Sequence, residues 1–291
     1  MTSYSPDPEL VAYRAATAQL VEELSRGRTA SDPSRVEAIL AERLRDPELD
    51  NVLKQLSSPV EAVVQRLLDE VRSFHPNERS MPGSLPGFVR LSLLSQIDAR
   101  WWDRSPAFIT DDEVDTSEQL IDLGPLRARK SLKFAYRSQP KGLPGRARDF
   151  AVRRGLPGLR PPTAGLRFAR SRLESIAFLN QLAADATGSL PLDTPPFWVT
   201  SLVRSEQHQA RLRALGYSAP LPSAHCVGQA IDIEMSWYRK FDQAGVVGAL
   251  LLERQDAGQI SVIDEGIAWH VCISPDACAG LRADYREAVA P

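Results

Sequence analysis

The chain has 291 residues, 43% hydrophobic and 25% charged, which is ordinary for a globular protein and long enough for one large domain or two. A formal net charge of −2 argues against a general attraction to nucleic acid or to an anionic membrane. No stretch approaches the roughly 18 apolar residues of a membrane span, and the N-terminus lacks the basic and hydrophobic regions of a secretion signal, so we expect a cytoplasmic protein.

Residues 8–75 have the pattern of several helices. Apolar side chains recur through this segment at close to helical spacing. Asp32-Pro33 is typical of an N-cap and a first-turn proline, and Ser58, followed three residues later by Glu61, has the spacing of a capping box. The segment shows no chemistry of its own. We interpret it as a helical packing or oligomerisation module, with the oligomeric state left open.

A Pro-, Gly- and Ser-rich stretch at 75–87 marks the first expected boundary. Residues 88–102 then predict an amphipathic helix that ends in a tryptophan pair, and the acidic residues 111–115 fit a helix N-terminus. We divide the chain into a helical region (1–75), a linker-rich middle region (76–165) and a C-terminal domain (166–291).

The middle region contains a strongly basic segment. Between residues 127 and 172, Asp149 is the only acidic residue opposed to many Arg and Lys side chains. Such a patch could hold a phosphate, a nucleic acid or an anionic substrate. It could equally be a solvated connection that pairs with the acidic segment before it. Because no aromatic stacking pattern accompanies the charge, we favour the connection and expect no nucleic-acid partner.

The C-terminal domain alternates helical and strand patterns. Helices are expected over 166–187, from 205 and over 243–254, and strands over 197–203, 230–234, 260–263 and 267–273. Helices followed by an antiparallel sheet indicate an α+β fold.

Two of the four histidines lie in apolar segments of this domain, where an imidazole needs a reason to be present. His225 and Asp232 are seven residues apart, too far for a shared ligand in an extended strand, but Gly228 allows a sharp bend between them. Asp232 would then point away from its two flanking isoleucines. His270 on the last strand could add a third ligand. Two His and one Asp with an open fourth position form a sound catalytic zinc set.

These residues carry a family resemblance. The pattern Ser223-x-His225-x-x-Gly228-x-Ala230-x-Asp232, followed by Trp269-His270, resembles the zinc D-alanyl-D-alanine carboxypeptidase/dipeptidase family, which shares its fold with the hedgehog signalling domain. The resemblance implies that His225, Asp232 and His270 bind zinc. It also implies that the zinc domain is built on an antiparallel sheet, which here would follow the helical N-terminal region.

A third element lies upstream of this motif. Ser201-Leu-Val-Arg204-Ser205 is similar to a family element whose arginine contacts the substrate near the scissile carbonyl. The resemblance therefore implies a substrate-binding and catalytic role for Arg204. It covers residues 197–275 and leaves the first 190 residues unexplained.

One position departs from the family pattern. The family places an acidic catalytic residue three positions before the last histidine, and Ile267 stands there in this chain. Positions three and five before His270 lie on the same side of a strand. A wide turn through Gly266 could therefore let Glu265 act as the base toward a zinc-acidified water.

Other residues are weaker candidates. Asp264 and Glu234 are alternative bases, although a surface charge is the simpler interpretation of Glu234. Ser223 is expected to orient the loop and to contact the substrate, and Trp269 either shapes the substrate pocket or packs beside the ligand strand. We expect His208 at the surface.

The sequence thus predicts a zinc metallopeptidase or amidohydrolase acting on a small peptide or amide with a free carboxylate. The alternative is a non-catalytic, zinc-stabilised binding protein that kept the fold and lost the base, which the isoleucine at position 267 favours.

Overall fold

We describe the protein from a computed structural model. It describes residues 5–26, 32–75, 83–140, 165–191, 194–217 and 221–289, together with residues 142, 161, 163 and 219. Part of the basic segment, residues 141, 143–160, 162 and 164, lies outside this description, so the prediction made for it stays untested. Among the described residues, no helix has both the length and the apolar character needed to cross a bilayer.

The N-terminal half is helical, as predicted. It contains α1 (Pro8–Leu24), α2 (Pro33–Arg43), α3 (Pro47–Leu53) and α4 (Val60–Ser73). Each of the first three begins with an aspartate followed by proline, and Asp7 and Asp32 accept hydrogen bonds from backbone N–H groups of the first turn. Helix α3 was not predicted, although its Asp46-Pro47 start carries the same signal.

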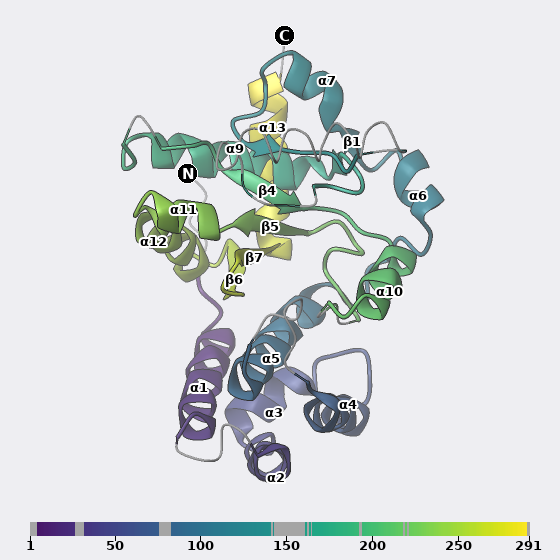
Figure 1. The fold of residues 1–291 in the computed structure, drawn as a ribbon, viewed down its shortest axis with the longest axis vertical. Coiled ribbons are helices and arrows are strands. Elements are labelled where there is room, and N and C mark those ends of the chain that lie inside the picture. Colours follow the sequence, from purple (N-terminus) through teal and green to yellow (C-terminus); the bar gives the residue numbers. More distant parts are fainter. Residues whose placement is uncertain are drawn as a thin grey trace.

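Helix α5 (Leu85–Trp102) connects this helical half to the rest of the molecule. Ser84 caps it, and its apolar residues share one buried cluster with those of α1 to α4. The hydroxyl of Tyr13 in α1 donates a hydrogen bond to the carbonyl of Leu93 at 2.8 Å. Ile263, from the C-terminal sheet, belongs to the same cluster. Figure 1 shows α5 between the other N-terminal helices and the sheet.

The C-terminal part contains a five-stranded sheet in the order β2-β4-β5-β7-β6. The strands are β2 (Ala135–Tyr136), β4 (Trp198–Ser201), β5 (Ala230–Glu234), β6 (Ile260–Asp264) and β7 (Ala268–Ile273). The α+β prediction is confirmed, but the sheet is mixed rather than antiparallel because β2 pairs parallel with β4. A parallel pair needs a crossover, and the chain between β2 and β4 supplies one that includes α9 (Leu173–Thr187).

One face of the sheet forms the core. Ile231, Ile233 and Val271 are fully buried there, covered by α9, α12 (Ala244–Asp256) and α13 (Cys278–Val289). Side chains alternate along a strand, so Asp232 and His270 point to the opposite face. That face looks toward α5 (Figure 1). The fold thus places the polar residues of β5 and β7 beside the N-terminal helices.

Smaller elements complete the described chain: α6 (Asp111–Thr116), β1 (Ile121–Asp122), α7 (Leu123–Ala128), β3 (Arg170–Ser171), α10 (Glu206–Ala214), α11 (Ser236–Lys240) and a 3-10 turn, η2 (Pro275–Ala277). The helix predicted from residue 166 begins only at Leu173, because residues 170–171 pair with β1. The division of the chain at residues 75 and 165 stays a prediction.

Candidate metal centre

A tight turn brings His225 back to the start of β5. Gly228 has φ +77°, a conformation that favours glycine, and its N–H donates to the carbonyl of His225 at 3.1 Å. A Cβ at Gly228 would come within 3.2 Å of Nε of Arg172. The bend expected from this glycine is therefore present, and it places Nε2 of His225 3.0 Å from Oδ1 of Asp232.

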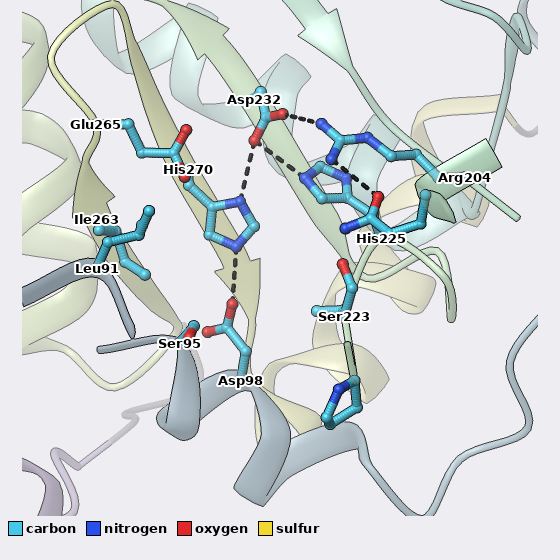
Figure 2. Close-up of a pocket in the computed structure, with 13 residues that line it drawn as sticks. Leu91, Ser95, Asp98, Arg204, Ser223, His225, Asp232, Ile263, Glu265 and His270 are labelled. Atoms are coloured by element: carbon cyan, nitrogen blue, oxygen red, sulfur yellow. Dashed lines mark hydrogen bonds and ion pairs between the residues drawn. The ribbon is translucent and has the colours of Figure 1, made fainter. Parts of the chain in front are cut away.

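Strand pairing brings the third residue to the same point. Asp232 of β5 lies directly opposite His270 of β7, and Nδ1 of His270 is 3.0 Å from the same Oδ1 atom of Asp232. All three side chains are buried, and one ligand atom of each lies within 4.8 Å of the others (Figure 2). Tetrahedral zinc with bonds of about 2.0–2.1 Å needs ligand atoms roughly 3.4 Å apart. The group is therefore suited to holding a metal ion after small side-chain adjustments.

The protonation of His225 fits a metal. Its Nδ1 lies 2.6 Å from the carbonyl oxygen of Leu202, which can only accept, so Nδ1 carries the proton. Burial, reinforced by the positive charge of Arg204, lowers the pKa of His225 to about 4. The neutral ring thus turns the lone pair of Nε2 toward the Asp232 carboxylate. Two acceptors at 3.0 Å repel each other unless a cation lies between them.

His270 is held by a residue that we did not predict. Its Nε2 lies 2.7 Å from Oδ2 of Asp98 on α5, so Nδ1 is the nitrogen that faces Asp232. Burial alone would lower the pKa of His270, but the hydrogen bonds to Asp232 and Asp98 outweigh it and hold the pKa well above its usual value. A metal ion would take the place of the proton on Nδ1. A ligand histidine whose second nitrogen donates to a carboxylate is a common arrangement in zinc sites.

The second oxygen of Asp232 is occupied by Arg204. An Nη2 atom of Arg204 lies 2.6 Å from Oδ2, and its Nε donates to the hydroxyl of Ser201 at 2.8 Å. Burial alone would raise the pKa of Asp232, but the charge of Arg204 and the hydrogen bond from His270 hold it well below its usual range. Arg204 therefore fixes the carboxylate with Oδ1 toward the two imidazoles. A contact between Arg204 and a substrate stays a prediction.

Glu265 lies in the turn between β6 and β7. Gly266 has φ +85°, and the N–H of Glu265 donates to the carbonyl of Ala268 at 2.9 Å, which makes the wide turn expected from the sequence. Figure 2 shows the Glu265 carboxyl group turned toward Asp232 and His270. Burial, and then the negative charge of Asp232, raise the pKa of Glu265 to about 7. Its carboxyl group is thus poised to exchange a proton near neutral pH.

The two alternative bases are engaged elsewhere. Asp264 is exposed, and its Oδ1 accepts from the N–H of Gly266 at 2.7 Å, which stabilises the turn. Glu234 is buried, and its carboxylate accepts from the N–H of Trp237 at 3.2 Å at the start of α11. Among the three candidates for the base, the arrangement therefore favours Glu265.

Two hollows meet at the site. The first lies against α5, with Leu91, Ser95 and Ser223 in its wall, and the second lies on the side of Phe168 and Tyr217. Both are also lined by Arg204, Asp232 and Glu265. A molecule in the first hollow would reach all three residues that could hold a metal, whereas one in the second would reach only Asp232 of the three. The predicted loop residue Ser223 lies at the wall of the first.

Trp269 and His208, two residues considered in the sequence analysis, lie outside the group that could hold a metal. Trp269 is buried in the hydrophobic core on the opposite side of β7 from His270, where its ring packs near Tyr238 and over Gly248. Of the two interpretations, packing beside the ligand strand thus describes it. His208 is partly buried rather than at the surface, and it lines the second hollow. Burial, and then the charge of Arg204, lower its pKa to about 4.

Asp98 could have been found from one signal. It continues the buried stripe of α5 at helical spacing from Leu91 and Leu94, where an unpaired carboxylate would be costly. Its partner, His270, is 172 residues away in the sequence, and no local pattern connects the two.

No family model, no curated protein and no solved structure matches this chain. What can be said of the site therefore rests on its own geometry and on the motif that contains it.

Proposed function

We propose that the protein is a zinc-dependent hydrolase of the D-alanyl-D-alanine peptidase type, which cleaves a peptide or amide bond in a small, carboxylate-bearing substrate. One observation carries the proposal. The donor atoms of His225, Asp232 and His270 converge in a pocket that Glu265 also lines. Three protein ligands leave a fourth position open, as in catalytic zinc sites.

Zinc is the metal that this donor set favours. Two imidazoles and one carboxylate suit several divalent metals, but a closely spaced set with room for a tetrahedral ion is typical of zinc. The similarity of the motif to a zinc peptidase family supports the same choice. When bound, zinc would acidify a water molecule and polarise the substrate carbonyl.

Glu265 would transfer a proton from the attacking water to the leaving nitrogen. Its carboxylate takes a proton from the attacking water as the water oxygen bonds to the carbonyl carbon. It then gives that proton to the leaving nitrogen as the carbon–nitrogen bond breaks, which yields a carboxylic acid and an amine. Burial raises the pKa of Glu265, which makes its carboxylate a stronger base toward water.

Arg204 would bind the substrate and orient Asp232. Its guanidinium lines both hollows while it holds Oδ2 of Asp232, so its positive charge faces the space next to the ligands. A free carboxylate on the substrate is the group that such a charge selects. The side chain would therefore position both a metal ligand and the substrate.

A matched pair of peptides tests the substrate class. The zinc-loaded protein is expected to hydrolyse short peptides with a free C-terminal carboxylate. It should act on the same peptides with an amidated C-terminus about 10- to 100-fold less efficiently, because a charge-assisted hydrogen bond is lost. The kcat/KM values for each pair, measured by chromatographic separation of the products, check this expectation.

The alternative is a non-catalytic, zinc-stabilised binding protein. The observation that favours it is Ile267, which occupies the position of the usual family base and is exposed. A protein that binds one zinc ion per chain but hydrolyses none of a broad set of peptides would contradict the hydrolase and leave this alternative.

A further inference from the structure

The contact between Asp98 and His270 joins the N-terminal helices to the metal centre. Oδ2 of Asp98 lies 2.7 Å from Nε2 of His270, and both side chains are buried. Figure 2 shows Asp98 reaching from α5 to the side of the imidazole that faces away from Asp232. The imidazole is thus bracketed by carboxylates from two parts of the chain.

Contacts on both sides hold helix α5 in place. Asp98 therefore cannot move with His270 unless the whole helix moves. On the helical side, the buried hydroxyl of Tyr13 in α1 donates to the carbonyl of Leu93. On the sheet side, Nε1 of Trp102 donates to the carbonyl of Ile273, in the same strand as His270, at 2.9 Å. The place of Asp98 is therefore set by the packing of α5 between α1 and β7.

Helix α1 contributes a compensating charge. Nη2 of Arg14 lies 3.4 Å from the hydroxyl of Ser261 in β6, and the guanidinium is close enough to Asp98 for the two charges to attract. A buried carboxylate next to a metal site needs such partners, since an isolated buried charge is strongly unfavourable. Two helices of the N-terminal half thus contribute to the surroundings of His270.

We infer that Asp98 is a positioning residue of the metal centre, and that the N-terminal helices are part of that centre rather than an appended module. Asp98 keeps the proton of His270 on Nε2 and the lone pair of Nδ1 toward the metal. The inference rests on the metal site of the proposed function, but not on turnover. Because linkage is reciprocal, a bound metal stabilises the docking of α5, and loss of that docking weakens metal binding.

Zinc affinity of the full-length protein tests the inference. In competition with a chromophoric chelator, Asp98→Ala is expected to bind zinc about 10- to 100-fold more weakly than the wild type. Asp98→Asn should lose less, because an amide oxygen still accepts from Nε2–H. Asp103→Asn is the matched control: Asp103, at the end of α5, accepts from the N–H of Ser57, and this variant should keep wild-type affinity.

A second readout separates positioning from a purely structural role. In the wild type, zinc should slow amide hydrogen exchange in α5, and this effect should be lost in Asp98→Ala. An Asp98→Ala protein that is less stable but binds zinc as tightly as the wild type would overturn the inference, as would a wild type that binds no zinc. Weakened zinc binding in Asp98→Ala, together with a wild type that hydrolyses nothing, would support the inference and contradict only the hydrolase.

Discussion

Replacing Glu265 with glutamine is expected to lower kcat by about 10²- to 10⁴-fold, which is the usual contribution of a general acid–base residue. The amide is nearly the same size as the carboxyl group, but it cannot take a proton from water or return one to the leaving nitrogen. Because Glu265 lines the pocket without being one of the three residues that could hold a metal, zinc content and thermal stability should stay close to the wild type. Steady-state kinetics and metal analysis of the same preparation measure both effects.

The neighbouring carboxylate supplies the control for this variant. Asp264 is exposed, and an asparagine in its place can still accept the hydrogen bond from the N–H of Gly266 that shapes the turn. Asp264→Asn should therefore keep wild-type kcat. A Glu265→Gln protein with wild-type turnover, or an equal loss in both variants, would show that Glu265 is not the base.

Replacing Asp232 with asparagine should abolish tight metal binding. Asp232 has one oxygen facing both histidines and the other paired with Arg204, so the change removes a ligand and leaves a mostly buried arginine without its counter-charge. We expect a loss of zinc affinity beyond the roughly 10- to 100-fold typical of outer-sphere changes. The free energy of unfolding should also fall by about 3–5 kcal/mol, as for a broken buried ion pair. Isothermal titration with zinc and chemical denaturation measure the two quantities.

Glu234 offers the same chemical change two residues along the same strand. Its carboxylate accepts from the N–H of Trp237, and a glutamine oxygen can do the same, so Glu234→Gln should keep zinc and lose at most about 1 kcal/mol. Asp232→Asn with unchanged zinc affinity would remove this residue from the ligand set.

The sequence was sufficient to predict the group that could hold a metal, because most of its signals are local. His225, Gly228 and Asp232 lie within one short segment, and the left-handed backbone of the glycine closes the turn that joins the other two. The third residue follows from strand pairing, since β7 is the antiparallel neighbour of β5 and places His270 opposite Asp232. Glu265 followed from strand alternation and from the glycine after it.

What the sequence did not reveal depends on packing between distant segments. Asp98 belongs to a helix whose pattern predicted only an amphipathic element, and its role appears when α5 is placed against β7. The parallel pairing of β2 was also missed, since two residues carry too little pattern to show the direction of their partner. Helix α13 was not predicted.

Metal analysis of the purified wild-type protein, compared with His225→Ala, decides most directly whether these residues form a zinc site. After dialysis against zinc and removal of the excess, the wild type should retain one zinc ion per chain and the variant essentially none. A wild type that retains no zinc, or a His225→Ala protein that retains as much as the wild type, would contradict the site assigned to His225, Asp232 and His270.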